Sequence, residues 1–418
     1  MDFKNYLVPG KTGLLIGIGG VSMSPLAEVL HDAGLDIRGS DMAESSNTLT
    51  LRERGIPIHI GHSADNVTDD ISFVIRTAAV HDDNPEVHEA HRRGIPVFER
   101  TQAWGALMRG YQNALCISGT HGKTTTTSMC THIMMAAEKD PTVMIGGTLP
   151  LLKACHRVGK GNTIIMESCE YYNSFLALNP TIAVVLNIEA DHLDFFKDLE
   201  DIKHSFRCFA ERVPAETGTV IANYDDANTM DALRGIARKV ITFGLNAKAD
   251  VYAQNIVHRG SVSEFDIYHR GNYFARVTLH VPGIHNVRNA LAATAAAIVL
   301  GVSPNAVKYG LAGFEGAGRR FDFKGKFQGA DLYDDYAHHP SELRALLDAV
   351  DTLNYQRTIV VFQPHTYSRT AKLFNDFVEQ LRRPTIVYLA EIYAAREKNT
   401  IGISSADLAA QIPGAKFL

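Results

Sequence analysis

The chain has 418 residues, of which 45% are hydrophobic and 21% are charged, and its formal net charge is −5. This composition is typical of a soluble globular protein, the length predicts two or three domains, and the negative charge without a long Lys/Arg run argues against nucleic acid as a partner. Five cysteines without Cys-x-x-Cys spacing argue against a disulfide framework or a cysteine-ligated zinc cluster and favour a reducing cytoplasm, and no segment is apolar over enough residues to predict membrane insertion.

The first elements predict a βα turn of the phosphate-binding kind. Residues 14–20 read as a buried strand that opens into glycines, and residues 23–33 have helical spacing of apolar side chains. Asp41 follows the next strand at a distance typical of the ribose-binding carboxylate of a dinucleotide fold. Apolar runs at 73–75 and 95–98 alternate with helical stretches, which predicts a parallel sheet. A Rossmann dehydrogenase remains an alternative for this part of the chain.

Residues 118–127, which read Ser-Gly-Thr-His-Gly-Lys-Thr-Thr-Thr-Thr, predict a phosphate-binding loop. They follow the apolar run 114–117 and precede a helix-like segment, so that glycine N–H groups and a helix N-terminus would face an anion. Lys123 would reach the β- and γ-phosphates, and the hydroxyl of Thr124 would hold Mg²⁺. The loop is a shortened variant, because Ile117 stands where the first glycine is usual. The sequence therefore predicts ATP binding.

Polar side chains follow two further predicted strands, at 162–166 and 182–186. Because the carboxyl ends of parallel strands share one crevice, Glu167 and residues 187–192 should face Lys123. Glu167 could complete the magnesium site with Thr124, and His192 is a candidate ligand of a second ion or, alternatively, a hydrogen-bonded histidine at a strand end. Glu170 is either part of this site or a solvated carboxylate.

Eight segments, in order along nearly the whole chain, resemble the Mur ligases, which are the ATP-dependent amino acid ligases of peptidoglycan synthesis. The matching segments are 17–20 with 40–41, 119–124, 167–170, 187–194, 282–290, 319–321, 334–340 and 363–370. The motifs are most similar to those of the branch that attaches L-alanine to UDP-N-acetylmuramate. This reaction forms an acyl phosphate on the muramate carboxylate, which the amine of L-alanine then attacks with release of ADP and phosphate. Because that chemistry needs no covalent nucleophile, we expect Cys169 to be a packing residue.

The resemblance implies an α/β protein of three domains. Residues 1–110 would form a Rossmann-like domain that binds the UDP-sugar, and residues 111–315 a central P-loop domain that binds ATP. Residues 316–418 would form a Rossmann-like α/β domain that binds the amino acid. The family continues beyond this chain's last residue with another strand and helix, so we expect an incomplete last sheet. Oligomeric state, monomer or homodimer, is not predicted.

The resemblance also assigns residues to each role. ATP would be bound by Gly119, Thr120, His121, Gly122, Lys123, Thr124, Thr125, Asn286, Asn289, Arg320 and Asp335, and Mg²⁺ by Thr124, Glu167 and His192. The UDP-sugar would be bound by Gly19, Gly20, Ser40, Asp41, His62 and Thr77, and the amino acid by Tyr336, His338, His365 and Arg369. The expected catalytic residues are Lys123, Glu167, His192, His338 and Arg369.

Three alternatives to this function remain open. A recycling ligase that attaches a whole tripeptide to the same UDP-sugar would share the chemistry. Apart from these alternatives, the strictness for L-alanine is open because many family members carry arginine where this chain has Thr366. A folate-type polyglutamate ligase shares the central domain but not the glycine-rich N-terminal one. The last alternative is a regulator that binds nucleotide and UDP-sugar without ligating them.

Overall fold

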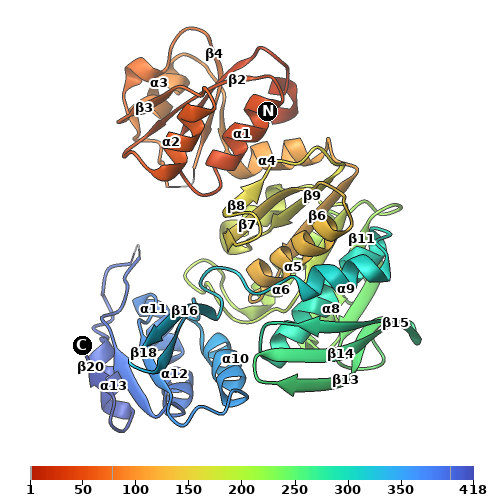
Figure 1. Cartoon of the computed structure of the whole chain (residues 1–418). Coiled ribbons are helices and arrows are strands. Elements are labelled where there is room, and N and C mark those ends of the chain that lie inside the picture. The colour runs from red at the N-terminus through yellow and green to blue at the C-terminus, as the bar shows by residue number, and fades with distance from the viewer. Residues whose placement is uncertain (1, 78, 396) are drawn as a thin grey trace.

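The structure is a computed structural model and describes residues 2–77, 79–395 and 397–418. Figure 1 shows the chain as three bodies: the N-terminal residues at the top, a large sheet with its helices in the middle, and the C-terminal residues at the lower left. The described residues form an N-terminal sheet, a central sheet, a short hairpin and a C-terminal sheet. Helices connect most of the parallel strands, so the predicted α/β class is confirmed.

The N-terminal sheet has five parallel strands in the order β3-β2-β1-β4-β5, which confirms the predicted parallel sheet. Its order reverses between β1 and β4, and an α/β sheet binds ligands at such a switch point. The apolar strand β1 is buried along its whole length between helices. Its elements are β1 Thr12–Ile16, α1 Ser24–Asp32, β2 Asp36–Asp41, α2 Ser46–Glu53, β3 Ile58–Ile60, β4 Ile71–Arg76, α3 Pro85–Arg92, β5 Val97–Glu99 and α4 Arg100–Met108, with short 3₁₀ helices at Phe3–Tyr6 and Ala64–Asn66.

The central sheet has ten strands in the order β15-β14-β13-β12-β11-β10-β6-β9-β7-β8. Seven neighbouring strands of this sheet, β13, β12, β11, β10, β6, β9 and β7, pair in parallel. The other three, β8, β14 and β15, are antiparallel to their neighbours. The strands are β6 Asn113–Ser118, β7 Thr142–Leu149, β8 Ala154–Arg157, β9 Thr163–Glu167, β10 Ile182–Val185, β11 Thr219–Asn223, β12 Lys239–Gly244, β13 Val251–Arg259, β14 Val262–His269 and β15 Asn272–Leu279.

Helices cover both faces of the central sheet because its middle strands are apolar on both sides. Helix α5 lies against α8 and α9 on one face, where the alanine-rich α8 lets the helices approach closely. The opposite face is covered by α6, whose Phe206 and Phe209 are fully buried. The helices are α5 Lys123–Ala136, α6 Leu199–Glu211, α7 Ala227–Ala232, α8 Ile284–Val299 and α9 Pro304–Ala312, with a 3₁₀ helix at Tyr171–Ala177.

The C-terminal residues form the hairpin β16–β17 and a small parallel sheet β18-β19-β20. Helices α10, α12 and α13 close a core around Phe377 and Leu408. Among the described residues this sheet has three strands, and the predicted domain boundaries at 110/111 and 315/316 remain predictions. The elements are β16 Asp322–Phe327, β17 Ala330–Asp334, α10 Pro340–Asp351, β18 Ile359–Phe362, α11 Tyr367–Lys372, α12 Phe374–Leu381, β19 Ile386–Leu389, α13 Ser405–Gln411 and β20 Lys416–Phe417.

None of the helices in the described ranges combines the length and the apolar composition that crossing a bilayer requires.

Candidate functional site

The loop between β6 and α5 has a backbone that only glycine fits at two positions. Gly119 has φ 143°, and a Cβ there would lie 2.8 Å from Cβ of Leu186. Gly122 has φ 85° and caps α5, and a Cβ there would lie 2.7 Å from Oδ1 of Asn289. The first N–H groups of α5 therefore open onto the loop, as an anion site requires.

Asn187, at the end of β10, fixes this loop from the neighbouring strand. Its Oδ1 accepts from the N–H of His121 at 2.8 Å, and its Nδ2 donates to the carbonyl of His121 at 3.0 Å. The hydroxyl of Thr120 accepts from the N–H of Glu189 at 2.9 Å. From the predicted segment 187–192, Asn187 and Glu189 thus contact the phosphate loop.

The side chain of Lys123 points back toward the phosphate-binding loop. Its Nζ donates to the carbonyls of Gly119 and Thr120, at 2.5 and 3.0 Å, and lies 3.0 Å from Oε2 of Glu170. Burial would lower the pKa of Lys123, but the Glu170 carboxylate outweighs it, so that the pKa is raised above its ordinary value. The lysine is therefore a buried cation held beside the place where phosphates would enter.

Thr124 and Glu167 lie together, as predicted. The Thr124 hydroxyl donates to Oε1 of Glu167 at 3.0 Å, and Oε2 of Glu167 accepts from the N–H of Gly146 at 2.7 Å. A hydroxyl and a carboxylate are hard oxygen donors, which Mg²⁺ prefers while it keeps several waters. The donor set at this position fits the metal ion that the sequence predicts.

His192 lies beside Glu170. Its Nε2 is 3.8 Å from Oε1 of Glu170, and its ring stacks on Tyr171 with centroids 4.3 Å apart. Burial, more than any neighbouring charge, lowers the pKa of His192 and leaves the imidazole neutral, as a metal ligand must be. Glu170 is only 2% exposed, so the alternative of a solvated carboxylate is wrong. The expectation that Cys169 packs inside is also wrong, because the thiol residue is exposed.

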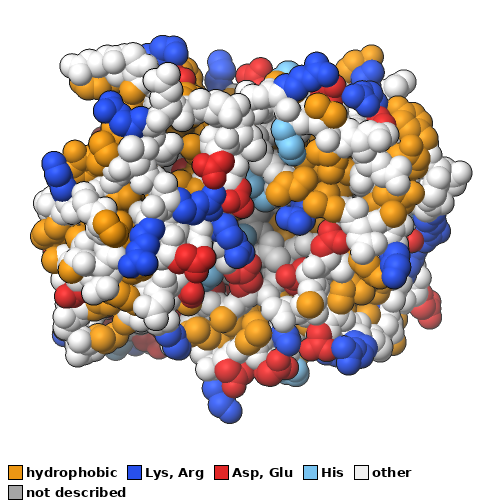
Figure 2. Space-filling view, turned by 90° about the horizontal axis from the view of Figure 1, so that it is seen from below, with side chains coloured by type: hydrophobic (Ala, Val, Ile, Leu, Met, Phe, Trp, Pro, Cys, Tyr) orange, Lys and Arg blue, Asp and Glu red, His pale blue; other side chains and the backbone are white. Residues whose placement is uncertain are grey.

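A cavity of about 520 Å³ is lined by residues of the central sheet and its helices and by residues of the C-terminal part, mainly from α10. In the face seen in Figure 2, acidic, basic and histidine side chains gather around a central hollow. The size is that of a site for a nucleotide-sized ligand. Of the predicted ATP-binding residues, those lining the cavity are His121, Gly122, Thr124, Thr125, Asn286, Asn289, Arg320 and Asp335, while Gly119 and Thr120 lie in the adjoining loop and Lys123 is the first residue of α5.

The polar side chains that line this cavity are fixed by hydrogen bonds within the protein. Asn286 donates to the carbonyl of Pro282 at 2.7 Å, and Asn289 donates to Oδ1 of Asn286 at 3.2 Å, so both amides keep free hydrogen-bonding capacity. The Asp335 carboxylate accepts from the N–H groups of Phe321 and Ala337, at 2.7 and 2.8 Å. Burial is the main reason that the pKa of Asp335 is raised.

The four predicted amino-acid-binding residues form one continuous row. The ring centroids of Tyr336 and His338 are 5.1 Å apart, and those of His338 and His365 are 5.6 Å apart. Nη1 of Arg369 donates to Nδ1 of His365 at 2.9 Å. Burial and then the Arg369 charge lower the pKa of His365 to about 4, so this imidazole is a neutral acceptor.

Arg369 forms an ion pair with Asp191, in the segment that follows strand β10. Its Nε and Nη2 donate to Oδ1 of Asp191 at 3.0 and 2.8 Å, and both side chains are 8% exposed. Burial raises the pKa of Asp191, but His192 and Arg369 outweigh it and hold that pKa well below its usual range. The hydroxyl of Thr366 caps α11 by accepting from the N–H of Arg369. The arginine thus joins the C-terminal residues to the strand end that carries His192.

The residues predicted for the UDP-sugar lie at or just after the carboxyl ends of β1, β2, β3 and β4. Asp41 accepts from the N–H of Gly19 at 2.8 Å, the neighbouring Gly20 is exposed, and Thr77 lies against Gly17. Ser40 and His62 both contact Oε2 of the buried Glu86, at 2.7 Å each. The sequence analysis missed Glu86, which holds these two side chains within the protein.

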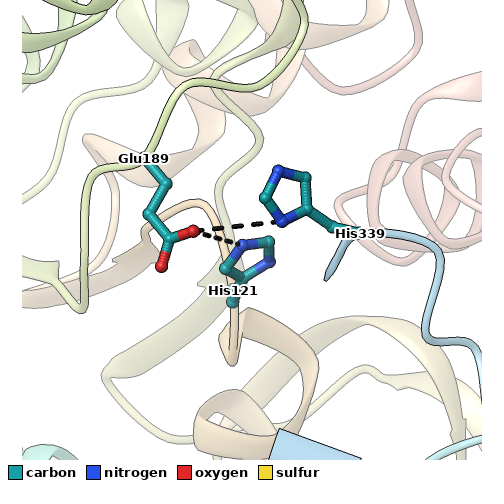
Figure 3. A group of neighbouring side chains, drawn as sticks. All are labelled: His121, Glu189 and His339. Carbon is teal, nitrogen blue, oxygen red and sulfur yellow. Dashed lines mark ion pairs between the residues drawn. The ribbon is translucent and has the colours of Figure 1, made fainter. Parts of the chain in front are cut away.

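A seam of histidines and carboxylates joins the phosphate loop to the start of α10, and Figure 3 shows three of its members, His121, Glu189 and His339. His121 Nδ1 is 3.1 Å from Glu342, its Nε2 is 3.5 Å from Glu189, and Ser341 donates to Glu189 at 2.5 Å. Burial would lower the pKa of His121, but Glu189 and Glu342 raise it to about 9. Despite its own burial, the pKa of Glu189 is lowered to about 2, chiefly by His121.

The sequence analysis assigned no role to Glu189, His339 or Glu342. Their signal was available in part, since His339-Pro340-Ser341-Glu342 has proline at the first helical position and glutamate at the third, which is the pattern of a capped helix start. The pattern predicts the helix but not which loop it would meet.

Three family models match the chain almost end to end. "Mur ligase family, catalytic domain" matches residues 15–112, "Mur ligase middle domain" matches residues 117–297, and "Mur ligase, glutamate ligase domain" matches residues 319–417.

Curated relatives are identical to this chain at almost half of the aligned residues. The UDP-N-acetylmuramate–L-alanine ligase of Agathobacter rectalis is 47% identical over 394 residues, which are 94% of this chain and 86% of that protein. The ligase of the same name from Clostridium novyi is 45% identical over 412 residues, which are 99% of this chain and 89% of that protein.

Solved structures agree. The UDP-N-acetylmuramate-alanine ligase of Thermotoga maritima superposes with a TM-score of 0.79 at 30% identity, covering 97% of this chain and 90% of the other. The UDP-N-acetylmuramate:L-alanyl-gamma-D-glutamyl-meso-diaminopimelate ligase of Neisseria meningitides has a TM-score of 0.66 at 26% identity, covering 73% of this chain and 99% of the other.

Proposed function

The chain belongs to the Mur ligase family, and on this premise we propose that it joins L-alanine to UDP-N-acetylmuramate with hydrolysis of ATP to ADP and phosphate. The relatives that match most of its length carry this activity in their names. The product would be a precursor of peptidoglycan. The observation that carries the proposal is the cavity in which phosphate-loop residues and residues of the C-terminal part line one space.

ATP would lie in this cavity with its phosphates at the N-terminus of α5. Transfer of the γ-phosphoryl group to the muramate carboxylate mainly requires positioning and charge neutralisation. Lys123 would supply positive charge once phosphate oxygens replace the loop carbonyls that it now contacts. Thr124 and Glu167, with His192 nearby through Glu170, would hold Mg²⁺, which when bound neutralises phosphate charge.

The acceptor amino acid would bind where the C-terminal row meets the strand end at residues 191–192. His365 is a neutral acceptor in this row and His338 donates through Nδ1 to the carbonyl of Tyr336 at 2.8 Å, which leaves its Nε2 for a ligand or a proton. Arg369 would share its guanidinium between Asp191 and the L-alanine carboxylate, because its planar fork has five donors.

The UDP-sugar would bind at the switch point of the N-terminal sheet. Gly19, Gly20, Asp41 and Thr77 lie at the strand ends there, while Ser40 and His62 support the edge through Glu86. The cytoplasm is the compartment that would supply ATP and keep the five cysteines of the chain as free thiols.

The test is release of phosphate from ATP in the presence of UDP-N-acetylmuramate with L-alanine, other amino acids, or the tripeptide. We expect release that requires both the sugar and L-alanine and that is lost in Lys123→Ala. Release with the tripeptide and not with L-alanine would favour the recycling ligase, and the 26% identity to such a ligase makes this the second candidate. Nucleotide binding without release under any condition would overturn the ligase and favour the regulator.

A further inference from the structure

His121, Glu189 and His339 form a cluster with the separations of a metal site. Each offers one ligand atom, and these atoms all lie within 4.8 Å of one another. Oε2 of Glu189 is 3.5 Å from Nε2 of His121 and 3.9 Å from Nδ1 of His339. The three side chains come from the phosphate loop, from the end of β10 and from the residue before α10, and they converge on one point (Figure 3).

The two histidines carry buried nitrogens that the structure leaves without a hydrogen-bond partner. Nε2 of His121 and Nε2 of His339 are both in this state, whereas the atom of His339 that faces Glu189 is Nδ1, which accepts from the N–H of Ser341 at 3.3 Å. Buried polar atoms in proteins are almost always satisfied, so such atoms need an explanation. At His121 the unsatisfied atom is the one that points toward Glu189.

Neighbouring side chains fix the cluster through hydrogen bonds, as the outer partners of metal ligands do. Nδ1 of His121 is 3.1 Å from Glu342, so a carboxylate holds the second ring nitrogen, and a metal ion would bind Nε2 by displacing the proton there. Glu189 itself accepts from the hydroxyl of Ser341.

Two imidazoles and one carboxylate are typical ligands of Zn²⁺, whereas Mg²⁺ prefers oxygen donors. In a tetrahedral zinc site with bonds of about 2.0–2.2 Å the ligand atoms lie roughly 3.4 Å apart. The two separations from Glu189 are close to this value, and the widest separation in the cluster, within 4.8 Å, must shorten by rotation of the side chains. We propose that His121, Glu189 and His339 bind one Zn²⁺, which joins the phosphate loop to the N-terminus of α10. His121 and Glu189 also line the nucleotide cavity, from which water can fill the fourth position.

This site is distinct from the proposed magnesium site at Thr124 and Glu167, since it shares no residue with it. A bound Zn²⁺ would hold together segments that are about 70 and 150 residues apart in sequence. It would therefore favour the docked arrangement of the central and C-terminal parts.

The experiment is titration of the full chain with Zn²⁺ in competition with a chromogenic chelator, with excess Mg²⁺ present. We expect one tight site, and Co²⁺ in its place should give the visible absorption of a four-coordinate ion. His339→Asn keeps a good helix cap without the imidazole, and Glu189→Gln keeps an acceptor for Ser341. Each should weaken zinc binding by about 100-fold or more, and Glu342→Gln by about 10–100-fold.

Cys208→Ser is the matched control, because Cys208 Sγ lies 3.5 Å from Nε2 of His204 on α6 and is a competing zinc-binding pair. The exposed His91→Asn controls for surface histidines. Thermal melting identifies any variant that fails to fold, in which case the Glu342→Gln affinity decides. Loss of the tight site in Cys208→Ser, or equal affinity in wild type, His339→Asn and Glu342→Gln, would overturn the proposal.

Discussion

Substitutions in the buried pair of Lys123 and Glu170 should separate the effect of the lysine on catalysis from its effect on stability. Lys123→Met removes a cation from a carboxylate that is 2% exposed, and an unpaired buried charge of this kind costs about 3–5 kcal/mol of unfolding free energy. Glu170→Gln in the same chain should restore most of that stability. Activity should stay about 10²–10³-fold below wild type in both, because the positive charge at the phosphates is lost.

Denaturant melts and phosphate-release rates of the three proteins measure this separation. If the double variant Lys123→Met/Glu170→Gln regained activity along with stability, the lysine would act only as a structural partner.

His156 gives a pH dependence to the contact between the N-terminal and central sheets. Its Nε2 is 3.1 Å from Glu28 of α1; burial would lower the pKa of His156, but the bonds to Cys155 and Glu28 raise it from 6.5 to about 9. A raised folded-state pKa contributes stability that is fully present below pH 6.5 and is lost as pH rises through about 9. Wild type should therefore lose more melting temperature over this range than Glu28→Gln. Parallel pH curves for the two proteins would refute the assignment.

At the scale of elements, the turn between β6 and α5 depends on glycine at residue 119. In Gly119→Ala the new Cβ would lie 2.8 Å from Leu186 and 3.2 Å from the backbone nitrogen of Asn187, at φ 143°. We expect a loss of about 1–3 kcal/mol in stability and at least tenfold weaker ADP binding by calorimetry. Gly271→Ala is the control, because it also has positive φ but meets nothing within 4 Å. Its ADP affinity should equal that of wild type.

The elements that carry local signals were predictable from the sequence. A strand, a glycine turn and a helix follow one another in β6, the loop and α5, so spacing alone located the phosphate loop. The rule for parallel strand ends placed Glu167 and Asn187 near it. The resemblance then supplied the row from Tyr336 to Arg369, which the structure brings together.

What the sequence did not predict depends on contacts between distant segments. The antiparallel strands β14 and β15 extend the central sheet, and no periodicity tells which sheet a strand will join. Glu170 reads as a polar residue on a turn, yet the fold buries it between Lys123 and His192. His339 reads as a helix cap, and only the docking of α10 places it beside His121.

For the whole molecule, the Arg369–Asp191 pair is a test of how the C-terminal part is held against the central sheet. Arg369→Met leaves Asp191 buried without its partner, which should cost about 3–5 kcal/mol and loosen the docking. Small-angle scattering should then show a larger radius of gyration than wild type, and addition of nucleotide and UDP-sugar should reduce it. Arg369→Met/Asp191→Asn should recover part of the stability. An unchanged radius in Arg369→Met would mean that other contacts hold the parts together.

The cavity between the central and C-terminal parts has a further consequence for inhibition. Its walls include His121 of the phosphate loop and Glu342 of α10, which contact each other across the seam. A compound that spanned both walls would touch side chains that also join the two parts of the protein. A bacterium that escaped such a compound by changing either residue would weaken the seam at the same time. Resistance at this position should therefore carry a fitness cost.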